Sequence, residues 1–168
     1  MTKVKIKKNN LERLKRQIRT QVRAKANKTL PNIIYEQVIE KNILRGKSPA
    51  QGGGRFKKYS KSYMKAIRSG RYGNQKRITP VNMFLNGDMI GSFAIDEIKN
   101  GFRLSFSDEK ARWHQLGKGR LPSRLLLPTK GGKTSRFNRR ITRAINNELI
   151  RLIKRVSAKM RLKRYFGF

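Results

Sequence analysis

The sequence has no cysteine, a single histidine (His114) and only nine Asp and Glu residues in a chain of 168. Without cysteine the chain forms neither disulfide bonds nor thiolate metal sites. One histidine excludes a metal site built from several histidines. The few acids show no spacing typical of a metal-dependent nuclease. We therefore expect no catalytic site, no cofactor and no metal, and synthesis in a reducing cytoplasm.

Long apolar runs are also missing. None approaches the roughly 18 residues that a membrane-spanning helix requires. The basic N-terminal stretch is not followed by an apolar run, because Lys or Arg recurs every few residues from Arg13 to Lys28. We expect no signal peptide and no membrane partner.

Positive charge is present in large excess. Lys and Arg account for 43 residues, and the formal net charge is +34 at pH 7. This exceeds what solubility needs and predicts a polyanionic partner, either nucleic acid or a strongly acidic protein surface. The length is that of one domain. We predict a single domain over residues 1–168, with a basic arm at 1–10 and a basic, aromatic tail at 161–168.

Two long amphipathic helices are predicted, one near each end of the chain. The first starts from a cap at Asn9 or Asn10 and bends at Pro31, and the last starts from a cap at Thr134 or Ser135. Apolar residues recur at steps of three and four in both. In the first helix they are Leu11, Leu14, Ile18 and Val22, and in the last they are Phe137, Ile141, Ile145, Leu149, Leu152, Val156 and Met160.

The remaining faces of these two helices are basic. Such faces are either simply solvated or follow the phosphates of a nucleic acid. On the second interpretation the predicted DNA contacts are Arg13, Arg16, Arg19, Arg23, Arg136, Arg139, Arg140, Arg143, Arg151, Lys154 and Arg155.

A β-hairpin is predicted from Phe93 to Phe106, because two strand-like runs are joined by Asn100-Gly101, a pair typical of two-residue turns. Its apolar face holds Phe102, Leu104 and Phe106 together with Ile95, while Ile98 falls on the polar side. A short helix is expected over 81–89 and a short buried strand over 125–127. The predicted fold class is α+β, with a small antiparallel sheet of the hairpin and short strands, flanked by a long N-terminal and a long C-terminal helix.

The stretch from Ala111 to Pro128 holds the only Trp and the only His of the chain. It predicts a short helix from Lys110 to Leu116 that presents Ala111, Trp113 and Leu116 on its apolar side and ends at Gly117. A stiff loop then follows to Leu127.

The order of several motifs resembles one known family. The aromatic-His-x-x-Gly step at Trp113 is followed by Leu-Pro-x-Arg at Leu121. Upstream lie Gly46-Lys47-Ser48-Pro49, Tyr59-Ser60-Lys61-Ser62-Tyr63, Ser69-Gly70-Arg71 and Val81-Asn82-Met83-Phe84-Leu85-Asn86-Gly87-Asp88-Met89. Together, over roughly Gly46 to Pro128, they resemble the virion morphogenesis and tail-completion proteins of tailed bacteriophages. Asn86 departs from the family's usual Thr.

The resemblance implies a structural virion protein of the neck or head–tail junction. Such connector subunits form homo-oligomeric rings around the DNA channel, between portal or adaptor proteins and tail proteins. Lys and Arg would then contact DNA without reading its sequence or contact acidic neighbours. The protein would be made in the bacterial cytoplasm and located in the virion.

For the loop from Gly117 to Leu127 we predict an intersubunit or neck-docking contact. Arg120 and Arg124 would project to carboxylates of a partner, although Arg124 pairing with an acid of its own chain is the alternative. His114 is alternatively a hydrogen-bonded helix residue that fixes the loop. The candidate interface residues are Trp113, His114, Leu116, Arg120, Pro122 and Arg124.

A second function fits the charge equally well. The chain would then be a stand-alone protein that binds nucleic acid without sequence preference, of ribosomal or nucleoid type. No signature of an established nucleic-acid-binding module supports this alternative. Oligomeric state distinguishes the two hypotheses, because only the first requires a ring.

Overall fold

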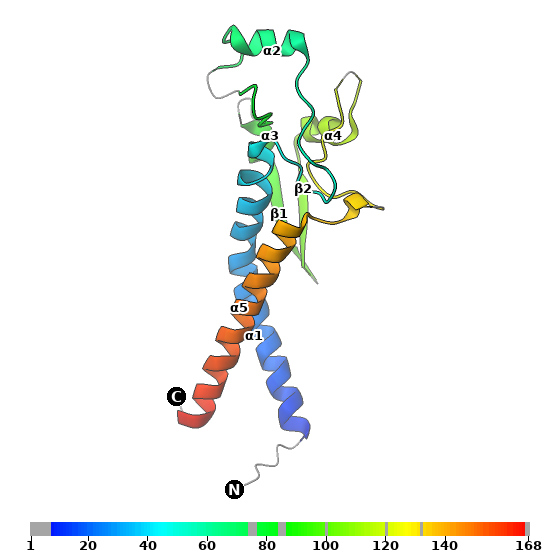
Figure 1. The fold of residues 1–168 in the computed structure, drawn as a ribbon. Helices are drawn as coiled ribbons and strands as arrows, with labels where there is room; N and C mark the ends of the chain where they lie inside the picture. The colour runs from blue at the N-terminus through cyan, green and yellow to red at the C-terminus, as the bar shows by residue number, and fades with distance from the viewer. Residues whose placement is uncertain are drawn as a thin grey trace. The chain divides into compact units, whose positions relative to one another are not determined.

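The computed structural model describes residues 8–73, 77–83, 87–99, 101–119, 121–131 and 133–166, without the side chains of 8–11, 133 and 161–166 (Figure 1). The described elements confirm an α+β fold with a long helix near each end and an antiparallel hairpin. They are α1 (Lys8–Tyr35), a π-helical turn (Glu36–Glu40), a 3₁₀ turn (Ile43–Arg45), α2 (Lys61–Arg68), α3 (Asp88–Gly91), β1 (Phe93–Ile98), β2 (Gly101–Phe106), α4 (Glu109–Leu116), a 3₁₀ turn (Lys133–Ser135) and α5 (Arg139–Phe166).

The chain divides into two compact units. Unit 1 comprises Met1–Pro31 and Ala144–Phe168, and unit 2 comprises Asn32–Arg143. Both α1 and α5 contribute to each unit. The prediction of a single domain concerns independent folding, so it stays a prediction.

Unit 1 contains most of the two long helices. Leu152 and Val156 of α5 are buried, as the apolar spacing predicted, and Leu14, Ile18 and Val22 of the predicted stripe on α1 are half-buried. Ala26 and Leu30 of α1, which were not part of that stripe, are also buried. Because α1 begins at Lys8, Asn9 and Asn10 lie inside the helix and the prediction that either caps it is wrong. Likewise α5 continues to Phe166, so most of the predicted tail is helical. Residues 1–7, most of the predicted arm, lie outside the described residues.

Unit 2 holds a core to which residues distant in the sequence contribute. Its side chains come from the end of α1, the turns after it, the segments around α2 and α3, α4, the loop after α4 and the first turn of α5. The buried apolar residues are Ile34, Val38, Ile39, Ile43, Ala50, Phe56, Tyr59, Ile67, Val81, Met83, Met89, Ile90, Ala111, Leu126 and Ile141.

The hairpin has the predicted faces but a different turn. Ile95 lies opposite Leu104 and Phe93 opposite Phe106, with the two phenyl rings 5.0 Å apart. Ile98 is exposed, as predicted, but it pairs with Gly101. Gly101 therefore belongs to β2 and not to the turn, so the predicted Asn-Gly turn is wrong at Gly101. Asn100 lies outside the described residues.

Two smaller predictions are wrong. Residues 81–83 are turn and irregular backbone, and only Asp88–Gly91 is helical near there, while 84–86 lie outside the described residues. Residues 125–127 form no strand. The backbone N–H groups of Leu126 and Leu127 donate to a side chain, Oε1 of Gln115, instead of to a strand partner. In the described residues the sheet has only β1 and β2.

The start of α5 is fixed by Asn138. Its Oδ1 accepts hydrogen bonds from the backbone N–H groups of Arg140 and Ile141, both at 3.1 Å. Its Nδ2 donates to Oδ1 of Asn42 at 3.1 Å, which ties the cap to the turns after α1. Asn138 therefore caps the helix, and the prediction of Thr134 or Ser135 is wrong because both precede its first turn.

Replacing Asn138 with Ala should destabilise the protein by about 0.5–2 kcal/mol, the usual cost of losing an N-cap. The free energy of unfolding in urea measures this. Asn147→Ala, an exposed position inside α5, is the matched control and should be neutral or slightly stabilising, because alanine favours helix interiors. Equal effects of the two substitutions would show that Asn138 does not act as a cap.

Candidate functional site

The candidate interface consists of α4 and the loop that follows it, both within unit 2. Oδ1 of Asp108 accepts from the Lys110 N–H at 2.8 Å and caps the helix. The helix ends at Gly117, as predicted, with φ of 76°. A Cβ at Gly117 would lie 2.9 Å from the Ser123 nitrogen. Glycine is therefore needed both for its conformation and for the close return of the loop.

Gln115 holds the far end of this loop against α4. Its Oε1 accepts from the Leu126 N–H at 2.7 Å and the Leu127 N–H at 3.1 Å, and its Nε2 donates to the Leu127 carbonyl at 2.8 Å. The Ser48 hydroxyl donates to the Leu125 carbonyl at 2.7 Å. One side chain of α4 thus takes the role that a neighbouring strand would have.

Arg124 is buried in the middle of the loop, with an exposed fraction of 2%. Its Nε and Nη2 donate to the Lys57 carbonyl at 3.2 and 3.1 Å, and Nη2 also donates to the Lys58 carbonyl at 3.4 Å. Its Nη1 lies 3.3 Å from Nδ1 of His114. Because a guanidinium only donates, Nδ1 must accept. Arg124 therefore joins the loop to α4 and to the segment before α2.

Aromatic rings continue from this arginine. The guanidinium lies 5.2 Å from the ring centre of Tyr59, Tyr59 contacts Tyr63 of α2, and Tyr63 contacts Tyr72, each pair at 5.0 Å. Burial raises the pKa of Tyr59 to about 12 and also raises that of Tyr63. Burial lowers the pKa of Arg124, while the two tyrosines raise it. Arg124, His114 and these tyrosines, called the internal joint below, hold the loop, α4 and α2 together within unit 2.

These contacts correct two predictions. Arg124 does not project toward a partner, because it is buried in its own chain. Nor does it pair with an acid: in the described part of the chain its hydrogen-bond partners are carbonyl groups and the His114 ring. The alternative for His114, a hydrogen-bonded residue that fixes the loop, fits its position, since its carbonyl also accepts from the Arg124 N–H at 2.7 Å.

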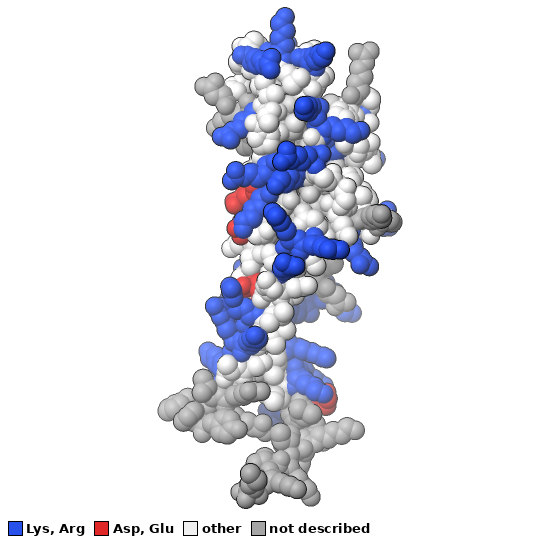
Figure 2. Space-filling view, in the orientation of Figure 1, with Lys and Arg blue, Asp and Glu red and all other residues white. Residues whose placement is uncertain are grey.

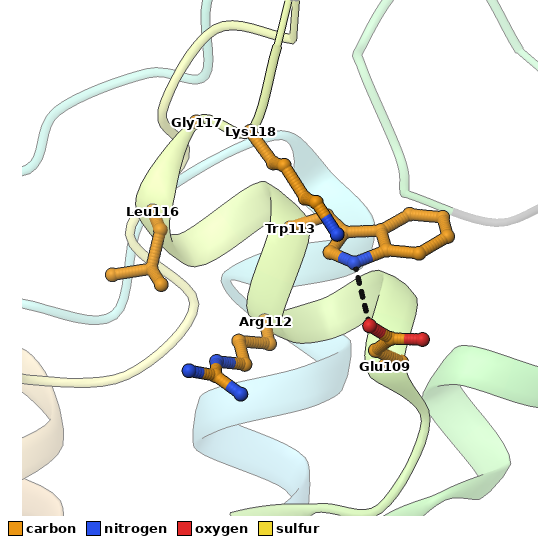
Figure 3. Close-up of a pocket in the computed structure, with 6 residues that line it drawn as sticks. All are labelled: Glu109, Arg112, Trp113, Leu116, Gly117 and Lys118. Atoms are coloured by element: carbon orange, nitrogen blue, oxygen red, sulfur yellow. Dashed lines mark hydrogen bonds between the residues drawn. The ribbon is translucent and has the colours of Figure 1, made fainter.

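The outer side of α4 borders a surface hollow of about 310 Å³. Figure 3 shows Trp113 between Lys118, whose Nζ lies 5.0 Å from the indole centre, and Glu109, which accepts from Nε1 at 3.1 Å. From the sequence, Trp113 and Leu116 are expected to anchor the base of the loop. Leu116 is 66% exposed, so this expectation is wrong for Leu116. Pro122 is half-buried, and Arg120 lies outside the described residues. Of the candidate residues described, Leu116 is exposed, and Trp113, like Pro122, is half-buried.

Between pH 10 and 12 the protein should lose stability partly through Tyr59. The phenol has an ordinary pKa of 10.0 when unfolded and about 12 when folded. In this window the unfolded state binds fewer protons, so the free energy of unfolding falls as pH rises. Tyr59→Phe should show a shallower fall in urea unfolding, and Tyr35→Phe, at a residue 39% exposed, should follow the unsubstituted protein. Equal slopes for all three proteins would exclude this role.

The second candidate site is the basic surface of the helices. In unit 1 the predicted contacts Arg13, Arg16, Arg19 and Arg23 on α1 are all exposed, as are Arg151, Lys154 and Arg155 on α5. Figure 2 shows Lys and Arg over much of one face of the molecule, with few Asp or Glu. The acids described in unit 1 are already paired, Glu12 with Lys15 at 2.8 Å and Glu148 with Arg151 at 3.0 Å.

Unit 2 carries the other predicted DNA contacts. Arg136, Arg139, Arg140 and Arg143 are all exposed around the start of α5. Arg139, Arg140 and Arg143 belong to α5 itself, and Arg136 precedes it. The structure therefore exposes all eleven predicted DNA contacts, and whether they bind DNA stays a prediction.

The sequence reasoning missed Gln115 and the tyrosine cluster. Tyr59 and Tyr63 stand four residues apart, a spacing that brings side chains together at a helix start. Nothing local marks Gln115, because its partners lie 11 and 12 residues further on.

Neither a metal cluster nor a membrane span is found within the described residues. No group of three or more His, Asp or Glu residues there is placed to hold a metal ion. No helix there is both long and apolar enough to cross a membrane. Comparison of the chain with protein-family models, with curated proteins and with solved structures found no match in any of the three.

Proposed function

We propose that this chain is a structural protein of the neck or head–tail junction of a tailed bacteriophage, where it forms a homo-oligomeric ring around the DNA channel. The motif order from Gly46 to Pro128, which resembles the tail-completion proteins, supports the virion assignment. The observation that carries the mechanism is the exposed basic surface of α1 and α5, whose nearby acids are already paired.

In this role the basic side chains contact DNA phosphates. A ring multiplies the charge of each subunit, so that moderate contacts per chain add up around a passing duplex. Phosphate contacts read no sequence, as a channel for a whole genome requires. The role needs no catalysis and no cofactor. Basic surface that does not face DNA meets acidic portal, adaptor or tail proteins, where complementary charge speeds association.

Contact between subunits is assigned to the outer side of α4. Trp113 and Leu116 both line the hollow, together with the exposed cations Arg112 and Lys118. Trp and Arg are enriched among the residues that dominate binding energy at interfaces. The loop behind them is held by Gln115 and Arg124, so it is presented without a large ordering cost on binding.

Sedimentation equilibrium in about 1 M salt, where the Debye length is about 3 Å, tests the assembly. A closed oligomer of fixed mass is expected, and Trp113→Ala with Leu116→Ala should dissociate it. Ile98→Ala is the matched control, at a residue 41% exposed on β1, and should leave the mass unchanged. A monomer with tight, salt-sensitive RNA binding would instead identify the stand-alone nucleic-acid-binding protein.

A further inference from the structure

A second apolar surface lies on α5 within unit 1. Ile150 and Ile153 are 51% and 47% exposed, whereas Leu152 and Val156 of the same helix are buried. The exposed pair belongs to a series with alternating steps of four and three, the spacing of a helix that packs along another helix. The series, called the open seam below, is Asn146, Ile150, Ile153 and Ser157.

The open seam is bordered by positive charge. Lys154, next to Ile153 and one turn after Ile150, is exposed. In a paired helix this position flanks the apolar contact and meets a charged residue of the partner. The acids described in unit 1, Glu12 and Glu148, are already engaged by Lys15 and Arg151. A partner helix must therefore supply its own carboxylates.

We propose that the open seam docks an acidic amphipathic helix of another protein. Apolar side chains of that helix cover Ile150 and Ile153, and its carboxylates lie against Lys154. A second copy of this chain is disfavoured, because it would bring more cations to the same surface. Binding of duplex DNA would account for the exposed cations. It would not account for the exposed isoleucines, since contact with charged phosphates does not stabilise apolar side chains. The inference is independent of the proposed virion role.

The probe is a synthetic helical peptide with Leu at a and d and Glu at e and g over three heptads, compared with a scrambled peptide of the same composition. The full-length protein should bind the patterned peptide about 10- to 100-fold more tightly, because only this peptide buries the isoleucines. Fluorescence anisotropy measures both affinities. Equal affinity for the two peptides would overturn the proposal, and this comparison requires no variant.

In the double variant Ile150→Ser with Ile153→Ser, the ratio of the affinity for the patterned peptide to that for the scrambled peptide should fall to about one. The affinity for the scrambled peptide should stay the same. Ile98→Ser, the same exchange at a residue 41% exposed in β1, is the matched control and should keep the preference. Retention of the preference by the double variant would contradict the proposal. So would a double variant that loses duplex DNA binding in equal measure, because the seam would then belong to a DNA interface.

Discussion

Arg124→Ala should destabilise unit 2 by about 2–5 kcal/mol, because it leaves buried carbonyl groups without donors. The side chain is 2% exposed and donates to the carbonyls of Lys57 and Lys58. Arg124→Lys should recover only part of this loss, since an ammonium group cannot reproduce the planar fork of donors. Urea unfolding of the purified protein measures both effects.

Arg112→Ala is the control for this prediction. Arg112 also lies in this region, on α4, but its side chain is exposed, so its removal should change stability by no more than about 0.5 kcal/mol. If Arg124→Ala unfolds at the same urea concentration as the unsubstituted protein and fails only in assembly, Arg124 acts as a docking residue after all and the internal joint is not needed.

The second large effect is expected in DNA binding. The logarithm of the affinity should fall linearly with the logarithm of the salt concentration. The steepness of this line should decrease by about 0.9 for each phosphate contact that is removed. Replacing Arg13, Arg16, Arg19 and Arg23 with Gln should therefore reduce the slope by about 3 to 4 if all four contact phosphates. The corresponding variant at Arg136, Arg139, Arg140 and Arg143 tests unit 2 in the same way.

A control variant removes the same charge elsewhere. Lys57, Lys58, Lys61 and Lys65 are exposed near α2, and their replacement with Gln should change the slope much less. Two unrelated duplexes should bind equally well to the unsubstituted protein. A strong preference for one duplex, or an equal loss of slope in the control variant, would contradict a defined phosphate-binding surface on α1 and α5.

Local signals in the sequence were sufficient for several elements. Apolar spacing predicted both long helices, alternation predicted the hairpin faces, and Gly117 predicted the end of α4, because each depends on residues a few positions apart. The cap of α5 was misplaced because Thr134, Ser135 and Asn138 are all good caps. The contact between Asn138 and Asn42, 96 residues apart, favours the last, and local sequence does not reveal it.

The interface prediction failed where long-range contacts decide. Arg124 was expected to project from a stiff loop to a partner's carboxylate, yet carbonyls 66 and 67 residues earlier in the chain hold it inside. The three leucines at 125–127 predict a strand. Instead, the N–H groups of Leu126 and Leu127 donate hydrogen bonds to the side chain of Gln115, not to a neighbouring strand. The basic surface was easier to predict, because Lys and Arg on the polar face of an amphipathic helix stay in water.

A topological retention assay tests most directly whether this protein encircles DNA. The protein is bound at low salt to linear duplexes with open ends, and the ends are then blocked in one of two samples. Both complexes are next shifted to about 1 M salt, where phosphate contacts are largely screened. A ring is expected to remain on the blocked duplex and to slide off the open one. Equal release from both duplexes would show that the protein binds the side of DNA and does not surround it.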